Sequence, residues 1–325
     1  MHTILCTVGT SSLEKLRMKT LPWLNGKENP LLKDYKTAIT DRFFKELDDA
    51  CMSYNKSRIE GTNHGSLDRF GKHCELLSQP YIRLISGESW RNDSKNYRLL
   101  PAEVASTLRI IKKLGYKENE IEIVLLVSDT LQSYVASQVI KAIFTKLGVE
   151  NCPLKIVDRF QMESMDKFTQ EGIPNFINQI KDDVQEDDKT IFNITGGYKN
   201  FIPLVTHIAS FYRKDMYYVF EEAVESDGEC VVKIPKIPTF NSYIGESSLG
   251  FIVELIQEIQ NIEFEDRIHM NRYIRDEIYG ESHVPYREFI SEFFDLIDGK
   301  IKLTLIGTIY LEMIQNENRG EAFNV

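Results

Sequence analysis

Residues 190–205, Thr-Ile-Phe-Asn-Ile-Thr-Gly-Gly-Tyr-Lys-Asn-Phe-Ile-Pro-Leu-Val, contain the pattern that decides the fold. An apolar segment of strand length ends in a polar loop with two adjacent glycines, and apolar residues at helical spacing follow it. Pro203 would break the interior of a helix but is tolerated in its first turn, so this helix is predicted to begin near Asn200. The stretch therefore predicts a strand, a glycine loop and a helix N-terminus in succession.

Strand and helix patterns alternate along the first two thirds of the chain. Strands are predicted at residues 2–8, 121–127, 154–157, 190–194, 216–220 and 230–234. Helices are predicted near residues 101–114, 131–147, 173–184 and 201–212. Strands separated by helices of this length are typical of βαβ units, whose strands pair in parallel. We therefore predict an α/β fold, with a Rossmann-like, mostly parallel sheet and helices on both of its faces.

The helix near 101–114 has two characteristic ends. Pro101 suits the first helical position, where no backbone N–H is needed, and Gly115 suits the C-terminal cap. Ala105, Leu108 and Ile111 are predicted to form its apolar face.

Pro235–Pro238 is predicted to separate two domains, residues 1–238 and residues 239–325. The polar stretch at about 20–80 does not follow the strand–helix pattern and is predicted to be an insertion or lid with one helix at 41–52. The second domain is predicted to be mainly helical and winged-helix-like. Its expected elements are a long helix at 249–279, a helix at 285–297, a short strand at 300–304 and a last helix from about 306.

Composition limits the class of protein and ligand. No apolar run reaches the roughly 18 residues of a membrane helix, and the N-terminus lacks the basic region of a secretory signal, so a cytoplasmic protein is expected. The five cysteines are odd in number and show no metal-binding spacing, which favours reduced, buried thiols and predicts no metal. The net charge of −10 argues against a long nucleic acid as the main ligand, but it leaves room for a small anion in a local pocket.

Three polar loops are expected at the carboxyl ends of the parallel strands, where ligands of such sheets bind: Gly9–Ser12, Ser128–Thr130 and Thr195–Asn200. The last of these combines two glycines, a helix N-terminus and the cationic side chain of Lys199, a combination suited to a phosphate. Taken alone, the two glycines of the last loop are more typical of a plain turn, and the loop Gly9–Ser12 is equally compatible with a tight connection. Ser128–Thr130 is more typical of a helix N-cap. None matches a P-loop or a dinucleotide-binding fingerprint, so no nucleotide cofactor is predicted.

The chain resembles the CRISPR-associated Rossmann-fold (CARF) family over roughly residues 1–235, with 20–80 poorly matched. Three blocks carry the resemblance: Ile-Leu-Cys-Thr-Val-Gly-Thr-Ser-Ser at 4–12, Leu-Leu-Val-Ser-Asp-Thr at 125–130 and Asn-Ile-Thr-Gly-Gly-Tyr-Lys-Asn at 193–200. Leu-Pro-Ala-Glu at 100–103 resembles the segment that precedes the second block. The resemblance implies a homodimer that binds a cyclic oligoadenylate across its two-fold axis, and some similar proteins are ring nucleases that switch off type III CRISPR signalling.

The resemblance also implies roles for individual residues. Ser11, or its neighbours Thr10 and Ser12, would orient the reacting ribose or phosphate, and Lys199 would stabilise the negative charge that develops at phosphorus. Lys199 acting as an electrostatic binder without catalysis is the alternative role. The other residues expected to contact the ligand are Gly9, Thr10, Ser12, Ser128, Asp129, Thr130, Asn193, Thr195, Gly196, Gly197, Tyr198 and Asn200. Cleavage would need no metal and would leave linear products with a 2′,3′-cyclic phosphate.

Two other functions stay open. The protein could sense the ring without cutting it and act through its C-terminal domain, or it could be an effector ribonuclease. The effector is disfavoured because Arg267 and Arg275 do not stand at the required distance from a following histidine, and Arg58 with His64 falls in the poorly matched insertion. The acidic C-terminal region favours a dimerisation or lid role over DNA binding. The size of the ring is not predicted.

Overall fold

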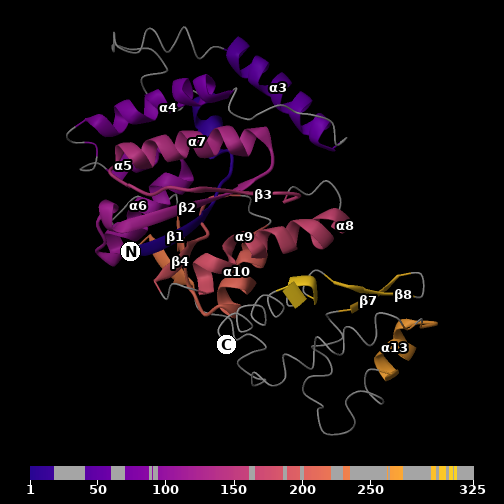
Figure 1. Ribbon diagram of the computed structural model, residues 1–325. Helices are drawn as coiled ribbons and strands as arrows, with labels where there is room; N and C mark the ends of the chain where they lie inside the picture. The colour runs from indigo at the N-terminus through magenta and orange to yellow at the C-terminus, as the bar shows by residue number, and fades with distance from the viewer. Residues whose placement is uncertain are drawn as a thin grey trace, which may run out of the picture. The chain divides into compact units, whose positions relative to one another are not determined.

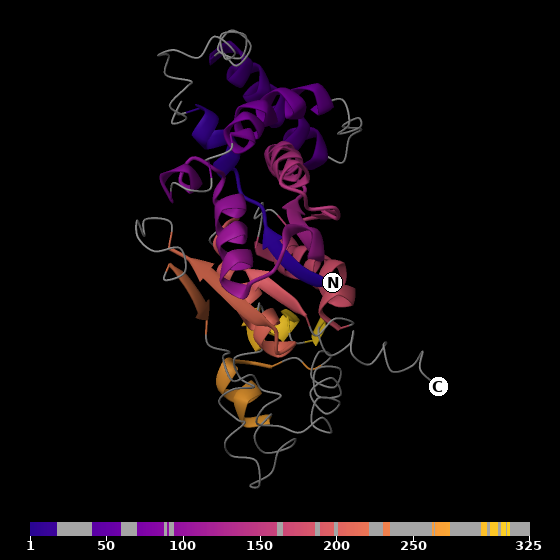
Figure 2. The same cartoon turned by 90° about the vertical axis from the view of Figure 1, so that its left-hand side faces the viewer.

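The computed structural model describes residues 1–17, 41–59, 70–87, 90, 94–160, 165–185, 189–197, 201–220, 230–234, 262, 264–273, 294–297, 300–304, 307–309 and 311–312 (Figures 1 and 2). The chain divides into two compact units. The first comprises Met1–Val157 with Asp183–Lys236, and the second comprises Asp158–Asp182 with Ile237–Val325.

A six-stranded sheet forms the first unit, in the order β3-β2-β1-β4-β5-β6. Its strands are β1 (His2–Thr7), β2 (Ile121–Ser128), β3 (Leu154–Val157), β4 (Thr190–Asn193), β5 (Asp215–Val219) and β6 (Val231–Ile234). The first five run parallel, and β6 pairs antiparallel with β5. The prediction of an α/β protein with a mostly parallel sheet is confirmed, and the predicted strands differ from the observed ones by no more than a residue at either end.

Strand β1 lies at the centre of the sheet, with Cys6 opposite Leu125 of β2 and Asn193 of β4. The chain first moves from β1 outward to β2 and β3, and then crosses to β4 on the other side of β1. The topological switch point, where ligands of open α/β sheets bind, therefore lies between the carboxyl ends of β1 and β4.

Helices α6 (Ala102–Leu114) and α7 (Leu131–Lys146) contact the sheet, α6 at β1, β4, β5 and β6 and α7 at β2. Helix α10 (Ile202–Phe211) contacts β5, and Figure 1 shows α7 and α10 on opposite sides of the strands. Pro203 lies in the first turn of α10, as the position of that proline predicted.

Helix α6 is more deeply buried than its sequence predicted. Pro101 is its N-cap, one position before the predicted one, and Gly115 caps its C-terminus in the left-handed conformation, with φ 71°. All ten residues from 102 to 111 are buried, although only one apolar face was predicted. The buried set includes four polar or charged side chains, those of Glu103, Ser106, Thr107 and Arg109.

The described part of the predicted insertion is a helical layer that packs on α7. Helix α3 (Asp41–Ile59) extends beyond the predicted 41–52, and α4 (Gly71–Ser86) was not predicted. Both contact α7, and Figure 1 shows α4 beside it. Helix α4 buries Cys74, Leu77, Tyr81 and Ile85 at helical spacing despite Pro80 in its interior.

In the second unit, Phe160, Phe168 and Phe176 form an aromatic cluster, in which the rings of Phe160 and Phe176 stack with centroids 4.6 Å apart. These residues belong to the segment that leads through α8 (Met165–Lys167) and the π-helical turn η5 (Phe168–Gly172) into α9 (Ile173–Gln185). Phe168 and Phe176 are buried there.

The C-terminal part contains α13 (Arg267–Tyr273) and an antiparallel hairpin of β7 (Phe294–Ile297) and β8 (Lys300–Leu303). The predicted helix at 285–297 is wrong at its last four residues. Phe-Asp-Leu-Ile alternates with period two and finds a strand partner in Lys-Ile-Lys-Leu. The predicted strand at 300–304 is confirmed. Of the predicted helix at 249–279, the structure describes residues 262 and 264–273. Residues 267–273 are helical, whereas 262 and 264–266 are not, so the prediction of one continuous helix is wrong there. The winged-helix assignment remains an expectation.

Candidate functional site

The loop after β1, which contains Gly9, and the loop after β4, which contains Gly196 and Gly197, meet at the switch point between these strands. We call them the two glycine loops. The hydroxyl of Thr7 donates a 2.9 Å hydrogen bond to the carbonyl of Gly196, which joins the ends of the two strands. Gly197 has a φ of 89°, and a Cβ atom on it would lie 2.6 Å from the Cβ of Thr7. A Cβ atom on Gly9 would lie 3.2 Å from the Cα of Gly197. The loops therefore pack backbone against backbone, and this approach requires glycine at position 197.

Glu103, in the first turn of α6, fills the space between these loops. Its fully buried carboxylate accepts hydrogen bonds from the N–H of Gly9 at 2.8 Å, from the hydroxyl of Ser11 at 2.7 Å and from the N–H of Gly197 at 3.2 Å. We call these four residues the Glu103 cluster. The N–H groups of Gly9 and Gly197, which belong to two of the predicted ligand loops, are thus bonded to an internal carboxylate.

The charge of Glu103 affects its neighbours. Burial, and after it the Coulombic effect of Glu103, raises the pKa of the Cys6 thiol. The same two causes, in the same order, raise the pKa of the Tyr81 hydroxyl, which donates a 2.6 Å hydrogen bond to the carbonyl of Ser12. Both groups therefore stay protonated beside the Glu103 cluster at neutral pH.

Of the three predicted residues that follow Gly9, Ser11 has the most suitable position for a ligand contact. It is half-buried, donates its only hydroxyl hydrogen to Glu103 and accepts a 3.2 Å bond from the N–H of Ala102. A hydroxyl oxygen has two lone pairs, so Ser11 can accept one further hydrogen bond. Thr10 donates to Glu14 at 2.9 Å, and the Ser12 side chain is fully buried and therefore not accessible to a ligand.

Asn193 and Thr195 are buried and their polar groups are used within the fold. The Asn193 amide donates to the hydroxyls of Ser106 at 2.7 Å and Thr107 at 2.9 Å, and its oxygen accepts from the N–H of Thr195 at 3.1 Å. The Thr195 hydroxyl accepts a 2.9 Å bond from the N–H of Val219. These contacts tie the end of β4 to α6 and β5, and they hold the glycine loop in place.

The loop Ser128–Thr130 forms the N-terminal cap of α7, which is the alternative that its sequence favoured. The Thr130 hydroxyl accepts a 3.2 Å bond from the N–H of Ser133, and the Ser128 hydroxyl donates to the Ser133 hydroxyl at 2.7 Å. Asn55 of α3 accepts a 3.4 Å bond from the N–H of Leu131. Two first-turn N–H groups of α7 are therefore satisfied within the chain. Asp129, the middle residue of the loop, is buried.

The predicted residues Tyr198, Lys199 and Asn200 lie outside the described residues. They directly follow Gly197, whose N–H contacts Glu103, and directly precede Phe201, the N-cap of α10. Within the part of the chain that the structure describes, no three His, Cys, Asp or Glu side chains form a group that could hold a metal ion.

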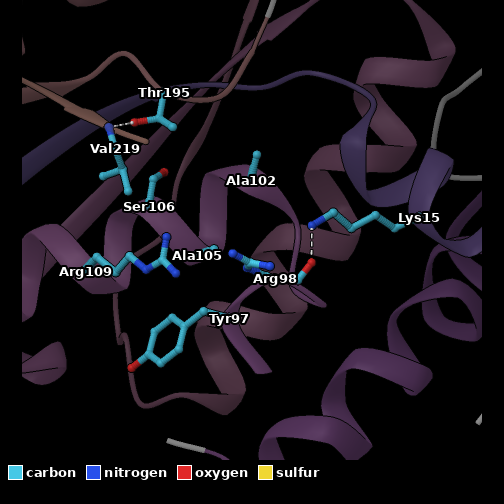
Figure 3. Close-up of a pocket in the computed structure, with 9 residues that line it drawn as sticks. All are labelled: Lys15, Tyr97, Arg98, Ala102, Ala105, Ser106, Arg109, Thr195 and Val219. Atoms are coloured by element: carbon cyan, nitrogen blue, oxygen red, sulfur yellow. Dashed lines mark hydrogen bonds between the residues drawn. The ribbon is translucent and has the colours of Figure 1, made fainter. Parts of the chain in front are cut away.

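A cavity of about 420 Å³ adjoins the glycine loop (Figure 3). We call it the basic cavity, because three of its nine lining residues are cationic and none is acidic. It is lined by Lys15, Tyr97, Arg98, Ala102, Ala105, Ser106, Arg109, Thr195 and Val219. Four of these residues project from a single face of α6, and Thr195 directly precedes Gly196. The cavity is large enough for a small organic ligand.

Arg109 is the most unusual residue of the basic cavity. Only 7% of it is exposed, and its guanidinium lies 5.4 Å from the ring centre of Tyr97, within range of a cation–π interaction. Lys15 is held by the carbonyls of Arg98 at 2.6 Å and Leu100 at 2.5 Å. Figure 3 shows Arg109 and Tyr97 on one side of the cavity and Lys15 on the other. This site was not predicted from the sequence, although the spacing of Ala102, Ala105, Ser106 and Arg109 places them on one helical face.

Comparison with known families gives one match. Residues 98–237 match a family described as CRISPR-associated protein (Cas_APE2256). The matched range holds α6 with Glu103 and Arg109, and it also holds the glycine loop after β4. β1 and the loop after it precede the match. The chain is therefore similar to a CRISPR-associated family over the segment that supplies most of the basic cavity. No curated protein matches the chain.

No helix among the described residues is both long enough and apolar enough to span a membrane.

Proposed function

We propose that the chain binds a cyclic oligoadenylate at the switch point between β1 and β4 and opens the ring without a metal. The observation that carries this proposal is the convergence of Gly9, Ser11 and Gly197 on a single oxyanion, the carboxylate of Glu103. Because one carboxylate joins both loops, they lie side by side at the switch point, where ligands of open α/β sheets bind. The basic cavity beside them and the similarity to a CRISPR-associated family support the same ligand class.

The buried carboxylate changes the role expected of the glycines. Because the N–H groups of Gly9 and Gly197 are bonded to Glu103, they position the loops rather than bind a phosphate directly. Ser11, with one acceptor site left, and the cationic Lys199, two residues after Gly197, are then the groups that meet the ligand. The proposed contacts with the phosphate are therefore limited to Ser11 and Lys199, which is fewer than the sequence alone predicted.

The proposed reaction is an internal transesterification. The ribose 2′-OH donates a hydrogen bond to Ser11, and its proton passes through the Ser11 hydroxyl to Glu103 as the 2′-oxygen bonds to phosphorus. The bond from phosphorus to the 5′-oxygen breaks, and that oxygen takes a proton from Lys199 or from water. The products carry a 2′,3′-cyclic phosphate at one end and a 5′-hydroxyl at the other. Lys199 stabilises the extra negative charge at phosphorus, and in-line positioning supplies much of the rate.

A second copy of the chain completes the proposed site. A cyclic tetra-adenylate has repeated phosphates, and a two-fold homodimer presents each loop twice, so that each half of the ring meets the same groups.

Incubation with cyclic tetra- and hexa-adenylate in EDTA, followed by chromatography of the products, tests the proposal. We expect linear products, and we expect Ser11→Ala and Lys199→Ala each to lower the rate by about 100-fold or more. Lys117→Ala is the matched control, because Lys117 is exposed and forms an ion pair with Glu120 at 3.5 Å. This variant should cleave at the wild-type rate.

The alternative is a sensor that holds the ring without cutting it. Its support is that the only hydroxyl hydrogen of Ser11 is already donated to Glu103. Tight binding of a ring that is recovered intact would establish the sensor and refute the ring nuclease. Cleavage of unrelated RNA only after addition of the ring would instead identify an effector ribonuclease.

A further inference from the structure

The basic cavity contains a buried cation for which the described residues offer no anion. Arg109 is 7% exposed, and none of the nine residues that line the cavity is acidic. In the described part of the chain, the interaction found for its guanidinium is the contact with the ring of Tyr97. Glu103, on the same helix, is hydrogen-bonded to Gly9, Ser11 and Gly197 instead.

A buried guanidinium without an anion is unfavourable on its own. It has five N–H donors, and the face of an aromatic ring compensates its charge without accepting hydrogen bonds in the guanidinium plane. Buried charges in folded proteins are normally paired and hydrogen-bonded. Arg109 is therefore a candidate for pairing with an anion that enters the cavity from solution, and the planar fork of its guanidinium suits a phosphate.

The size and the remaining walls of the cavity identify the class of ligand. A volume of about 420 Å³ far exceeds what an isolated phosphate ion needs, since a water molecule takes about 30 Å³ of liquid. Ala102, Ala105 and Val219 supply an apolar wall beside the cations. Such a combination fits a ligand with one anionic group and an organic part.

We propose that the basic cavity binds an organic phosphate of mononucleotide size, with Arg109 as its main phosphate contact. Arg98 and Lys15 add positive charge elsewhere on the cavity wall, and the apolar wall contacts the organic part. The ligand can be a free mononucleotide or one nucleotide unit of a larger molecule bound at the neighbouring loops. The proposal does not depend on ring opening.

Isothermal titration of the full chain with adenosine 5′-monophosphate, inorganic phosphate, adenosine and cyclic tetra-adenylate tests the assignment. We expect the mononucleotide to bind more tightly than either phosphate or adenosine, because each of these lacks half of the contacts. Arg109→Met should weaken binding of the mononucleotide by about 10- to 100-fold, and Arg109→Lys should restore part of it.

Arg17→Met is the matched control. The Arg17 guanidinium lies 5.3 Å from the ring centre of Phe44, a geometry close to that of Arg109 over Tyr97, but it is half-exposed and pairs with Asp48 at 2.6 Å. This variant should bind the mononucleotide as the wild type does. Thermal unfolding adds a structural readout, because loss of an unpaired buried cation should not lower the melting temperature.

The outcomes separate this proposal from the proposed function. Mononucleotide binding that requires Arg109, in a chain that does not bind the ring, supports the cavity and refutes the ring as ligand. Ring binding that requires Arg109, without mononucleotide binding, supports the cavity as a subsite for one nucleotide of the ring. Ring binding that is unaffected in Arg109→Met, with no mononucleotide binding, overturns the cavity assignment and leaves the proposed function intact. A lowered melting temperature with unchanged ligand binding also overturns it.

Discussion

The hydroxyl of Ser11 donates a 2.7 Å hydrogen bond to the fully buried carboxylate of Glu103. This bond joins the N-terminus of α1 (Ser11–Arg17) to the N-terminus of α6, two elements separated by the whole of the predicted insertion. Because the same carboxylate also binds the N–H groups of Gly9 and Gly197, one side chain fixes both glycine loops. The edge of the sheet is thereby ordered before any ligand arrives.

Glu103→Gln should destabilise the fold. The amide retains one acceptor oxygen for Gly9 and Gly197 but presents an N–H₂ group to Ser11, and it loses the charge that strengthens all three bonds. We expect a loss of about 2 kcal/mol, which lowers the melting temperature of a unit of this size by about 4–8 °C. Thermal unfolding followed by circular dichroism measures it. Glu120→Gln is the control, because Glu120 is exposed and pairs weakly with Lys117, and a shift equal to that of the control would contradict the structural role of Glu103.

Gly197→Ala should destabilise the chain more than a typical glycine replacement. The φ of 89° is unfavourable for alanine, and the new Cβ would lie 2.6 Å from the Cβ of Thr7. We expect a loss of about 2 kcal/mol or more, measured by urea unfolding. Gly71→Ala is the matched control, since Gly71 begins α4 and a Cβ there meets nothing within 4 Å. That replacement should be neutral or slightly stabilising, and equal effects at the two positions would refute the tight packing of the loops.

The sequence predicted most of the first unit because its strands are continuous apolar runs. Residues Ile123–Val127 and Ile4–Cys6 are buried on both faces of the sheet. Strands buried in this way are continuous apolar segments, which can be recognised in the sequence. Helix α4 escaped prediction because Pro80 normally ends a helix, whereas here it lies in a helix that is stabilised by packing against α7.

The site was harder to predict because its main contacts join distant parts of the chain. Glu103 and Gly9 are 94 residues apart, and an acid in the first turn of a helix is ordinarily explained by the helix dipole. Arg109 belongs to none of the motifs or apolar faces that the sequence predicted. Its burial depends on Tyr97 and on the ends of β4 and β5, which no local pattern reveals.

Thr130→Ala distinguishes a cap from a ligand contact. The Thr130 hydroxyl accepts the N–H of Ser133, and loss of such a cap costs about 1 kcal/mol of folding free energy. We expect that loss in urea unfolding, and we expect unchanged affinity for cyclic tetra-adenylate in titration calorimetry. Thr130→Ser keeps the acceptor and should recover most of the stability. Normal stability with weakened ring binding in Thr130→Ala would contradict this prediction and would show that the loop contacts the ligand.

The buried thiols predict that stability falls in alkaline solution. Burial raises the pKa of Cys51 and Cys152 to about 12 and that of Cys74 to about 11, from an ordinary value of 9.0. Between these values the folded chain keeps protons that the unfolded chain has lost, so deprotonation favours unfolding. The stability contributed by the protonated thiols is complete below pH 9 and is lost as the pH rises to the folded values. Each thiol contributes a slope of about 1.4 kcal/mol per pH unit in that window.

Urea unfolding with a reductant, at about pH 8, 9 and 10, measures this slope as the change in the free energy of unfolding. Cys152→Ala removes one of the thiols whose pKa is raised and keeps a small apolar side chain at a buried position, so its slope above pH 9 should be shallower by about 1.4 kcal/mol per pH unit. Its stability near pH 8 serves as the baseline, since these thiols are then protonated in both states. An identical slope in Cys152→Ala and the wild type would mean that the Cys152 thiol ionises as readily in the folded chain as in the unfolded one.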